Sequence, residues 1–263
     1  MWQLILFLVS LVCDSVGFIS YIFFFSIGYG LAIAAIAVTM AIMNWSHLAA
    51  AEIAMIATLL VYGLRLALHL IMREVKSTTY HKVVDQKGSN GERIAIAAKL
   101  AMWFACSLLY VLQTSPVYFR LANGAAPDAM LVVGTVLAVC GLVLETAADV
   151  QKAVAKRREP YAYVSSGLYA FVRCPNYLGE LIFWFGVFLS GVTVLRGPLQ
   201  WLEAIAGLLL IIYVMFSGAR RLEIRQDRNY GKSKAYRTYV RTVPILIPFV
   251  PLYSVMRYTW LAA

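Results

Sequence analysis

The sequence predicts an all-α integral membrane protein with about seven transmembrane helices, an N-terminus outside and a cytoplasmic C-terminus. Three observations lead to this fold class: the composition, the lengths of the apolar segments and the distribution of positive charge. Of the 263 residues, 62% are hydrophobic, and the mean hydropathy is +0.75. A soluble domain is far less apolar, so we expect one polytopic membrane domain covering residues 1–263.

The apolar segments are long enough to cross a bilayer. Residues 1–43 are apolar apart from Asp14 and a few small polar groups, which suffices for two spans joined tightly near residues 25–30. About 20 apolar residues in a helix cross the hydrocarbon core, and helices are expected because lipid satisfies no backbone groups. No removed signal peptide is expected, because the first segment has no early Lys or Arg. The remaining spans are predicted at residues 47–72, 94–115, 128–151, 177–195 and 199–218.

Positive charge is concentrated in three segments. Of the 23 Lys and Arg residues, 19 lie in residues 73–93, 151–176 and 219–263. In a seven-span arrangement these are the loop after the third span, the loop after the fifth and the C-terminal tail, which all face one side. Positive residues mark the cytoplasmic side. The opposite loops carry only Arg120 and Arg196.

The net charge of +10 has the same explanation, since topology and anionic lipid head groups account for most basic residues of membrane proteins. Nucleic-acid binding is therefore not expected. The four cysteines are scattered and form no CxxC pair, so neither a disulfide framework nor a metal site is predicted.

One block of polar residues stands where a cytoplasmic loop enters an apolar helix. Arg173, Asn176, Tyr177 and Glu180 precede a run of apolar residues at 181–189. A carboxylate at the mouth of such a segment is costly unless something pairs with it, so the default expectation is a functional site. We expect a pocket at the membrane surface that holds a polar, charged ligand.

Two carboxylates end the fifth predicted span. Glu145 and Asp149 are four residues apart and share one helical face. They repel each other unless they pair with cations or accept hydrogen bonds from a ligand. Two interpretations remain open: neutralisation by Lys152, Lys156 or Arg158, or a role in ligand binding.

The segments that follow the fifth and seventh spans combine cations with aromatic rings. Arg158, Tyr161 and Tyr169 suit a nucleotide, because Arg binds phosphate and a planar ring packs on a base. The alternative is a juxtamembrane basic and aromatic belt. Beyond the seventh span the helix should run to about Asp227, followed by a short amphipathic helix that Pro244 terminates. Tyr236, Arg237 and Arg241 of that helix form a second candidate phosphate wall, or a positive stripe facing lipid.

The third predicted span carries the polar residues Glu52, Tyr62, Arg65 and His69. An Arg inside a span must face a cavity or a carboxylate. Glu52 lies about 20 Å from Arg65 along the helix, so these two do not pair directly. Two interpretations of His69 remain open, a catalytic role and a structural role.

Three separated blocks resemble one family, the steroid 5-alpha-reductases. They are Asp149-x-x-Lys152, the run Gly-Leu-Tyr-x3-Arg-x-Pro-Asn-Tyr-x-Gly-Glu at 167–180, and the tail Tyr-Arg-x-Tyr-x4-Pro-x-x-Ile-Pro at 236–248. The resemblance covers roughly residues 132–250. It implies seven helices around NADPH, which enters from the cytosol. It also implies reduction of the carbon–carbon double bond of a conjugated enone lipid, typically a 3-oxo-Δ4 steroid.

The resemblance assigns roles to particular residues. It implies that Asn176 and Glu180 contact the nicotinamide–ribose end of the cofactor. Cys174 departs from the pattern, since many relatives have His there, so this position is not expected to be essential. The complete predicted cofactor-binding set is Glu145, Asp149, Lys152, Arg158, Tyr161, Tyr169, Arg173, Asn176, Tyr177, Glu180, Tyr236, Arg237 and Arg241.

The predicted chemistry is hydride addition to the β-carbon, with an acid or tyrosine hydrogen-bonded to the carbonyl oxygen. Relatives place a Glu in the second span and a Tyr in the third, but residues 28–43 contain no acid. The catalytic candidates are therefore Glu52, Tyr62 and His69. We expect residues 1–127 to bind a hydrophobic substrate from the bilayer and residues 128–250 to bind the cofactor.

Two other functions remain open. An isoprenylcysteine-type carboxyl methyltransferase shares a similar Arg-x-Pro-x-Tyr block but uses S-adenosylmethionine, which carries no phosphate. A non-enzymatic lipid-binding membrane protein holds no nucleotide. The expected setting is the inner membrane of a bacterium, with membrane lipids around a monomer and the cofactor site on the cytoplasmic side.

Overall fold

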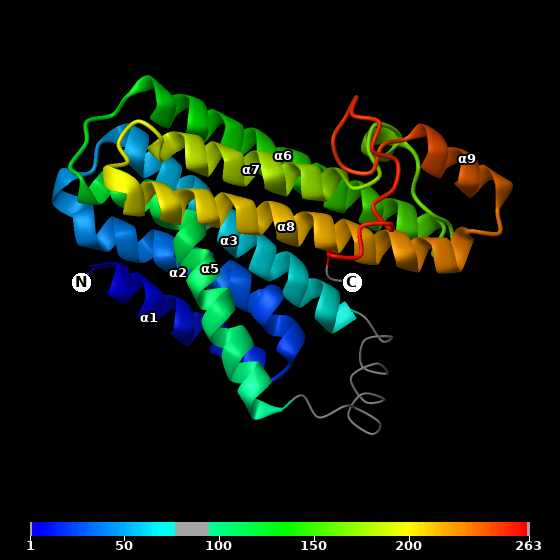
Figure 1. Cartoon of the computed structure of the whole chain (residues 1–263), viewed down its shortest axis with the longest axis horizontal. Helices are drawn as coiled ribbons and strands as arrows, with labels where there is room; N and C mark the ends of the chain where they lie inside the picture. Colours follow the sequence, from blue (N-terminus) through cyan, green and yellow to red (C-terminus); the bar gives the residue numbers. More distant parts are fainter. Residues whose placement is uncertain (1, 77–94, 262–263) are drawn as a thin grey trace. The chain divides into compact units, whose positions relative to one another are not determined.

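The computed structural model describes residues 2–76 and 95–261, and every regular element in these ranges is helical (Figure 1). The loop predicted at 73–93 lies largely outside the described residues. The α-helices are α1 Trp2–Asp14, α2 Ile27–Asn44, α3 Ala50–Lys76, α5 Ile96–Ala122, α6 Ala129–Arg158, α7 Pro175–Gly191, α8 Gly197–Tyr230 and α9 Lys234–Thr242. Short 3-10 helices are η1 Ser15–Phe18, η2 Tyr21–Phe25, η3 Trp45–His47 and η4 Gly167–Ala170.

Five of the described helices are long and apolar enough to cross a membrane: those within α2, α3, α5, α6 and α8. Apolar helices also occupy the other two predicted places, but α1 with η1 covers only Trp2–Phe18 and α7 has 17 residues. The prediction of a membrane protein with apolar helices is confirmed. The expected extension of the last long helix is also confirmed, because α8 continues to Tyr230 and α9 ends at Thr242, before Pro244.

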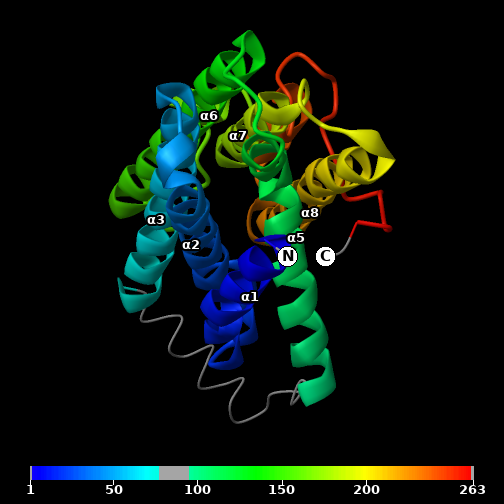
Figure 2. The ribbon, with the colours of Figure 1, turned by 90° about the vertical axis from the view of Figure 1, so that its left-hand side faces the viewer.

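The first connection differs from its prediction. The break between α1 and α2 occupies residues 15–26, and the expected joint at 25–30 is largely helical. Gly28 and Gly30, inside the expected joint, serve close packing. A side chain at Gly30 would approach the Ala67 backbone nitrogen to 2.7 Å, so α2 and α3 lie side by side with their backbones in contact (Figure 2).

The chain divides into two compact units. The first unit comprises Met1–Val132 and Phe188–Gly207, and the second comprises Val133–Val187 and Leu208–Ala263. The first therefore contains α1, α2, α3 and α5, and the second contains most of α6, α7 and α8 with α9 and the tail.

Within the second unit, α6 and α7 approach closely because glycines face each other. A Cβ at Gly179 would lie 2.6 Å from the Glu145 nitrogen, and one at Gly141 would lie 2.4 Å from the Phe183 nitrogen. A small apolar core then joins the loop before α7 to α8 and the tail. It contains Cys174, Ala219, Leu222, Ile245, Leu246, Val255 and Leu261.

Candidate functional site

The loop between α6 and α7 is attached to α6 by Gln151. The Leu168 backbone nitrogen donates to Gln151 Oε1 at 3.0 Å. Gly167 has a φ of +60°, and a Cβ there would lie 1.7 Å from Gln151 Nε2. Only glycine suits both the backbone conformation and the close contact. The buried Tyr169 follows, and its hydroxyl donates to the Ala148 carbonyl at 3.3 Å.

Arg173 is the charged centre of the second unit, and it is 2% exposed. Its Nη2 donates to Glu223 Oε1 at 2.7 Å and also to the Tyr253 carbonyl. The other oxygen of Glu223 accepts from the Val255 backbone nitrogen at 2.8 Å. The Arg173 backbone nitrogen donates to the Pro244 carbonyl at 2.9 Å, so the tail fixes both the backbone and the side chain of Arg173.

Part of the hydrogen-bonding capacity at this centre is unused. Nε and Nη1 of Arg173 are buried and have no hydrogen-bond partner among the described residues. The hydroxyl of Tyr236, a residue that is 1% exposed, also lacks a well-formed partner in that part of the chain. Tyr236 nevertheless lies near enough to Arg173 for the guanidinium charge, and a poorly aligned hydrogen bond from it, to act on the Tyr236 hydroxyl. Buried donors of this kind are costly unless a ligand accepts from them.

Four tyrosines surround this centre, and we call Tyr163, Tyr230, Tyr236 and Tyr239 the tyrosine cluster. Tyr163 stacks on Tyr239 with ring centroids 5.5 Å apart and meets Tyr236 edge to face at 5.1 Å. The Tyr239 hydroxyl donates to the Tyr169 carbonyl at 2.7 Å. The cluster thus ties α9 and the end of α8 to the loop before α7.

Lys156 completes the edge of the tyrosine cluster. Its Nζ donates to the Ala162 carbonyl at 2.6 Å and to the Tyr230 hydroxyl at 3.2 Å. Lys156 therefore contacts the loop. One interpretation of the sequence had Lys156 neutralise Glu145 and Asp149 of α6 instead. Lys152 does interact electrostatically with Asp149, and both residues are half-buried.

Burial keeps the tyrosine hydroxyls and the Cys174 thiol of this region uncharged. Desolvation raises the pKa of Tyr236 to about 12, although the positive charge of Arg173 acts in the opposite direction. Desolvation also raises the pKa of Cys174 to about 12, and it raises the pKa values of Tyr169 and Tyr239. The hydroxyls therefore remain hydrogen-bond donors throughout the physiological pH range.

A half-open cleft of about 540 Å³ lies between the C-terminal end of α6 and the following loop. Gln151 and Arg158 line it from the helix, and Tyr163, Ser165 and Ser166 line it from the loop. Tyr163 belongs to both the cleft and the tyrosine cluster, so the two features are contiguous. Arg158 is the residue of the predicted cofactor set that lines this cleft.

The entrance of α7 contributes a second group of predicted residues. Glu180 is 5% exposed, and its Oε1 accepts from Trp184 Nε1 at 3.0 Å. Glu145 is also buried, on the face of α6 that packs against Gly179. Asn176 and Tyr177 are half-buried on the first turn of α7. The α6–α7 interface thus holds two buried carboxyl groups.

Three residues of the predicted set are exposed and separate from these contacts. Tyr161 is 92% exposed. Arg237 and Arg241 are exposed on α9, and Arg237 Nε donates to the Gly231 carbonyl at 2.6 Å. Cofactor binding by these three residues, like that by the rest of the predicted set, stays a prediction.

The catalytic candidates all lie on α3, in the first unit. Glu52 caps its own helix: Oε2 accepts from the Ala49 backbone nitrogen at 2.9 Å, as in one half of a capping box. Tyr62 is fully buried, and its hydroxyl donates to the Tyr29 hydroxyl at 3.0 Å. His69 is half-buried, two turns further along. Their catalytic roles stay predictions, but the cap already accounts for the buried Glu52 carboxylate.

The prediction of candidate residues omitted a buried carboxyl group. Asp14 ends α1, is 0% exposed and lies with Oδ2 3.5 Å from the Ser107 hydroxyl. The available signal was a single acid within the first apolar segment, which the cost of charge in lipid marks as a functional candidate.

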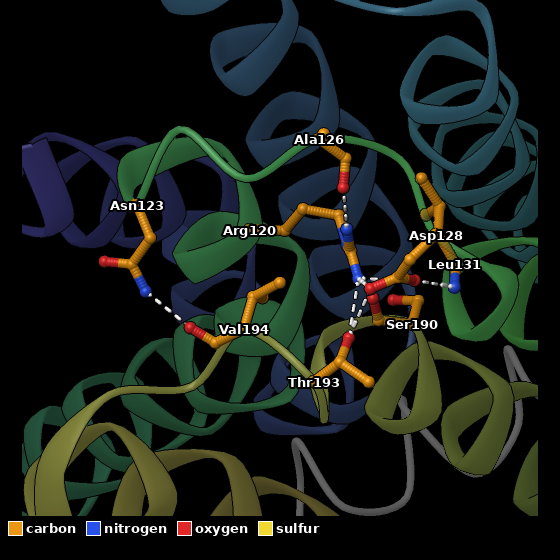
Figure 3. A network of polar contacts seen from close by, with 8 residues as sticks. All are labelled: Arg120, Asn123, Ala126, Asp128, Leu131, Ser190, Thr193 and Val194. Atoms are coloured by element: carbon orange, nitrogen blue, oxygen red, sulfur yellow. Dashed lines mark hydrogen bonds and ion pairs between the residues drawn. The ribbon is translucent and has the colours of Figure 1, made fainter.

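The opposite end of the first unit holds a buried arginine (Figure 3). Arg120 lies in the last turn of α5 and is 1% exposed, whereas the sequence placed it in a loop. Its Nε donates to the Ser190 carbonyl at 2.7 Å and its Nη1 to the Ala126 carbonyl at 3.1 Å. Nη2 meets Asp128 at 2.9 Å and the Thr193 hydroxyl at 3.1 Å. These contacts engage every nitrogen of the guanidinium group, so this network is structural.

Comparison with known proteins assigns the chain to a family. No curated protein and no solved structure matches the chain. Residues 7–243 match the family described as "Protein of unknown function (DUF1295)". This family is linked to steroid 5-alpha-reductase-like proteins. Because the match extends over most of the sequence, the chain belongs to the DUF1295 family.

Proposed function

We propose that this protein uses NADPH to reduce the carbon–carbon double bond of a conjugated enone in a hydrophobic, steroid-like or lipid-like substrate. The observation that carries the proposal is the buried Arg173, whose Nε and Nη1 have no well-formed acceptor beside the buried Tyr236 hydroxyl in the described part of the chain. The resemblance of roughly residues 132–250 to steroid 5-alpha-reductases supports the same conclusion.

The unused donors fit a phosphorylated cofactor. Glu223 accepts a hydrogen bond from only one of the three guanidinium nitrogens of Arg173, so Nε and Nη1 remain available. A phosphate oxygen would accept from the remaining nitrogens and from Tyr236. Charge-assisted hydrogen bonds of Arg to phosphate are among the strongest in proteins. The burial of Arg173 increases their strength, because solvent screens them less.

The neighbouring residues would orient the cofactor. The tyrosine cluster offers ring faces beside the cleft, where Arg158 adds a further cation. Asn176 and Glu180 at the entrance of α7 offer an amide and a carboxyl group of the kind that binds a carboxamide and ribose hydroxyls. When bound, NADPH would supply a hydride to the substrate; the protein's part is to position that cofactor and to polarise the substrate carbonyl.

The proposal includes the membrane topology. Adding α1 and α7 to the five long apolar helices makes seven spans, with the N-terminus outside and the C-terminus inside. The cation-rich ends of α6 and α8 would then face the cytoplasm, the compartment that contains NADPH. The proposed setting is the inner membrane of a bacterium, where the protein would act as a monomer.

Two alternatives differ in what they bind. S-adenosylmethionine has no phosphate and offers Arg173 a single carboxylate, whereas the dinucleotide carries several phosphate charges, so the concentration of cations around Arg158 and Arg173 favours the dinucleotide. A non-enzymatic lipid-binding protein would carry no nucleotide at all.

Mass spectrometry of small molecules released from the detergent-purified protein tests the proposal. We expect NADP(H) in amounts comparable with the protein, and NADPH added to stripped protein should rebind in a fluorescence titration. Recovery of S-adenosylmethionine, or failure of NADPH to bind at millimolar concentration, would contradict the proposal. The matched variant Arg173→Lys keeps the charge but loses the guanidinium geometry, and it should weaken NADPH binding.

A further inference from the structure

The tail after α9, drawn in red in Figure 1, forms an exposed apolar loop in the second unit. The Ile245 backbone nitrogen donates to the Leu252 carbonyl at 2.9 Å and closes residues 246–251 into a loop. Leu246 is 0% exposed and belongs to the apolar core of this unit, so the base of the loop is fixed. Three large apolar side chains of the loop are exposed: Ile247 (37%), Phe249 (99%) and Val250 (43%).

Phe249 has a backbone conformation that its side chain disfavours. Its φ is +64°, and among the described residues it alone has a positive φ without being glycine. A bulky residue rarely adopts this region, and such strain persists only where the surrounding structure imposes it. Glycine would suit this backbone better. A phenyl ring that is both strained and fully exposed gains stability only from a contact outside the chain.

The last residues of the tail run back along α8 to its apolar stretch. The Trp260 ring is exposed and stacks on Tyr213 with centroids 6.2 Å apart, and the Trp260 carbonyl accepts from the Tyr213 hydroxyl at 3.3 Å. Arg220 Nε donates to the Met256 carbonyl at 3.2 Å, and its Nη1 donates to the Leu261 carbonyl at 3.1 Å. Tyr213 lies about 10 Å before Arg220 along the helix, within the uncharged stretch that ends at Arg220. Trp and Tyr concentrate at membrane–water interfaces, so these contacts locate the tail at the boundary between the apolar part of α8 and water.

The charges of the tail suit an anionic surface. Residues 231–263 contain five Lys and Arg residues and no Asp or Glu. Residues 242–256 carry no charge at all, and the exposed Arg241 and Arg257 lie at their two ends. Exposed cations close to a bilayer are attracted to negative lipid head groups. The tail therefore combines an apolar loop with flanking cations, a combination that it shares with segments lying in the surface of a membrane.

Residues on both sides of the loop hold the Arg173 centre. Before the loop, the Pro244 carbonyl accepts from the Arg173 backbone nitrogen at 2.9 Å. After the loop, the Tyr253 carbonyl accepts from Arg173 Nη2, and the Val255 backbone nitrogen donates to Glu223 Oε2 at 2.8 Å. The loop joins these two sets of contacts. Its position and the orientation of the guanidinium group therefore depend on each other.

We propose that the loop 246–251 inserts Phe249 into the nearby leaflet of the bilayer, with Arg241 and Arg257 on anionic lipid head groups, and that this insertion keeps the Arg173 centre ordered. The occupant of the exposed surface is thus the same bilayer that surrounds α8. Insertion removes the Phe249 ring from water, and this gain offsets the strain of its backbone. The lipid contact needs no cofactor, whereas its effect on NADPH binding rests on the proposed function.

Photocrosslinking in a bilayer tests the lipid contact. The full-length protein carries benzoylphenylalanine in place of Phe249 and is reconstituted into nanodiscs of phosphatidylcholine and phosphatidylglycerol. We expect lipid adducts in a yield similar to that from Leu209, which is 58% exposed on the apolar part of α8. Asn229, exposed about 13 Å beyond Arg220 on the same helix, is the control and should give few adducts. Lipid adducts from position 249 as rare as those from position 229, or crosslinks to a second copy of the chain in their place, would overturn the inference.

Hydrogen exchange in the same nanodiscs measures the coupling to the Arg173 centre without a cofactor. Phe249→Gly removes the ring and relieves the positive φ, so the fold should be retained. The backbone N–H groups of Arg173 and Cys174 donate to tail carbonyls, and we expect them to exchange at least about threefold faster in this variant than in wild type. Phe249→Leu keeps an apolar side chain and should retain wild-type exchange. Equal exchange in wild type and Phe249→Gly would overturn the inference.

NADPH titrations in nanodiscs separate this inference from the proposed function. We expect Phe249→Gly to raise the Kd for NADPH about threefold or more, because a smaller fraction of the protein has an ordered Arg173 centre. Wild-type NADPH affinity in Phe249→Gly, together with unchanged amide exchange, would overturn the inference and leave the proposed function standing. If the wild-type protein binds no NADPH, the proposed function fails, and the lipid adducts and the amide exchange alone decide the inference. The crosslinking result also decides it if Phe249→Gly does not fold.

Discussion

Arg173 and Glu223 form an ion pair of 2.7 Å between the loop before α7 and the helix α8, with side chains only 2% and 1% exposed. Fifty residues separate them in the sequence, and the tail contributes the carbonyl of Tyr253 and the backbone nitrogen of Val255 to the same pair. This pair fixes the charge that the proposed cofactor site uses. Its loss should therefore affect both stability and binding.

Glu223→Gln tests the structural half of that statement. Removing one partner of a buried pair costs about 3–5 kcal/mol, because the remaining charge is left buried without compensation. We expect the thermal unfolding midpoint of the detergent-solubilised protein to fall by roughly 5–10 °C. NADPH should restore part of this loss by supplying phosphate charge. The control Glu159→Gln changes an exposed side chain and should leave the midpoint unchanged. Equal midpoints for both variants would contradict the importance of the pair.

Tyr236→Phe tests the binding half by removing a single hydroxyl. A hydrogen bond to a charged group contributes about 1.5–3 kcal/mol, so the Kd for NADPH should rise about tenfold or more. Because burial raises the pKa of Tyr236 to about 12, the effect should be constant between about pH 6 and pH 9. Isothermal titration calorimetry measures it. Tyr253→Phe is the control, since that ring is 40% exposed and only its backbone carbonyl meets Arg173. Identical affinities for Tyr236→Phe and wild type would exclude Tyr236 from the site.

Asp128→Asn tests the network of Figure 3 through its pH dependence. Burial opposes ionisation of Asp128, but hydrogen bonds from Thr193 and Arg120 outweigh it and lower the pKa to about 2. A carboxyl group with a lowered pKa stabilises the fold above its unfolded value of about 3.9, and this contribution is lost as the pH falls toward 2. The wild-type advantage over Asp128→Asn in unfolding midpoint should therefore be full at about pH 6 and shrink between about pH 4 and pH 2. A pH-independent difference would contradict this account.

Gly179→Ala tests the close approach of α6 and α7. The added Cβ would lie 2.6 Å from the Glu145 backbone nitrogen, which no side-chain rotation relieves. The helices must separate, so we expect about 1–3 kcal/mol of destabilisation and weaker NADPH binding at the neighbouring Glu180. Gly218→Ala is the control, because its Cβ would meet the Tyr177 ring at an ordinary 3.4 Å. In thermal unfolding, Gly179→Ala should have the lower midpoint of the two variants. Similar midpoints would contradict a close contact between α6 and α7 at Gly179.

Glu52→Gln separates capping from catalysis. The amide oxygen of Gln still accepts from the Ala49 nitrogen, so the cap and the stability of α3 should be retained. We expect progesterone reduction at the wild-type rate, measured by NADPH oxidation, together with an unchanged unfolding midpoint. A large fall in kcat with an intact fold would instead assign Glu52 a catalytic role.

Much of the local structure was predictable from residue patterns. The apolar segments between 27 and 230 coincide with helices because the length and composition of a segment are properties of neighbouring residues. Pro244 likewise predicted the end of α9, through its missing N–H. The joint predicted at residues 25–30 was misplaced, because residues 1–43 are apolar almost throughout and their composition does not mark where one helix ends and the next begins.

The candidate site was predictable only in part. The block at 167–180 identified Arg173 and Glu180 as polar residues at a membrane entrance, and both are buried as such a site requires. Tyr161 and Arg241 have the same chemical character but are exposed, because the sequence does not state which face of a loop or short helix packs inward. Glu223 was absent from the predicted set, since nothing local distinguishes it from the other charges of α8.

By itself, then, the sequence determined the class of protein, the extents of its long helices and the segment in which a charged ligand site belongs. These follow from hydropathy and from the cost of exposing backbone or charge to lipid, both of which act over short stretches of chain. Only the tertiary structure decided which charges pair and which donors remain unused. Arg173 meets Glu223, and Asp14 meets Ser107, because particular helices pack together across 50 and 93 residues of sequence. Those contacts depend on the packing of distant side chains, which no local pattern specifies.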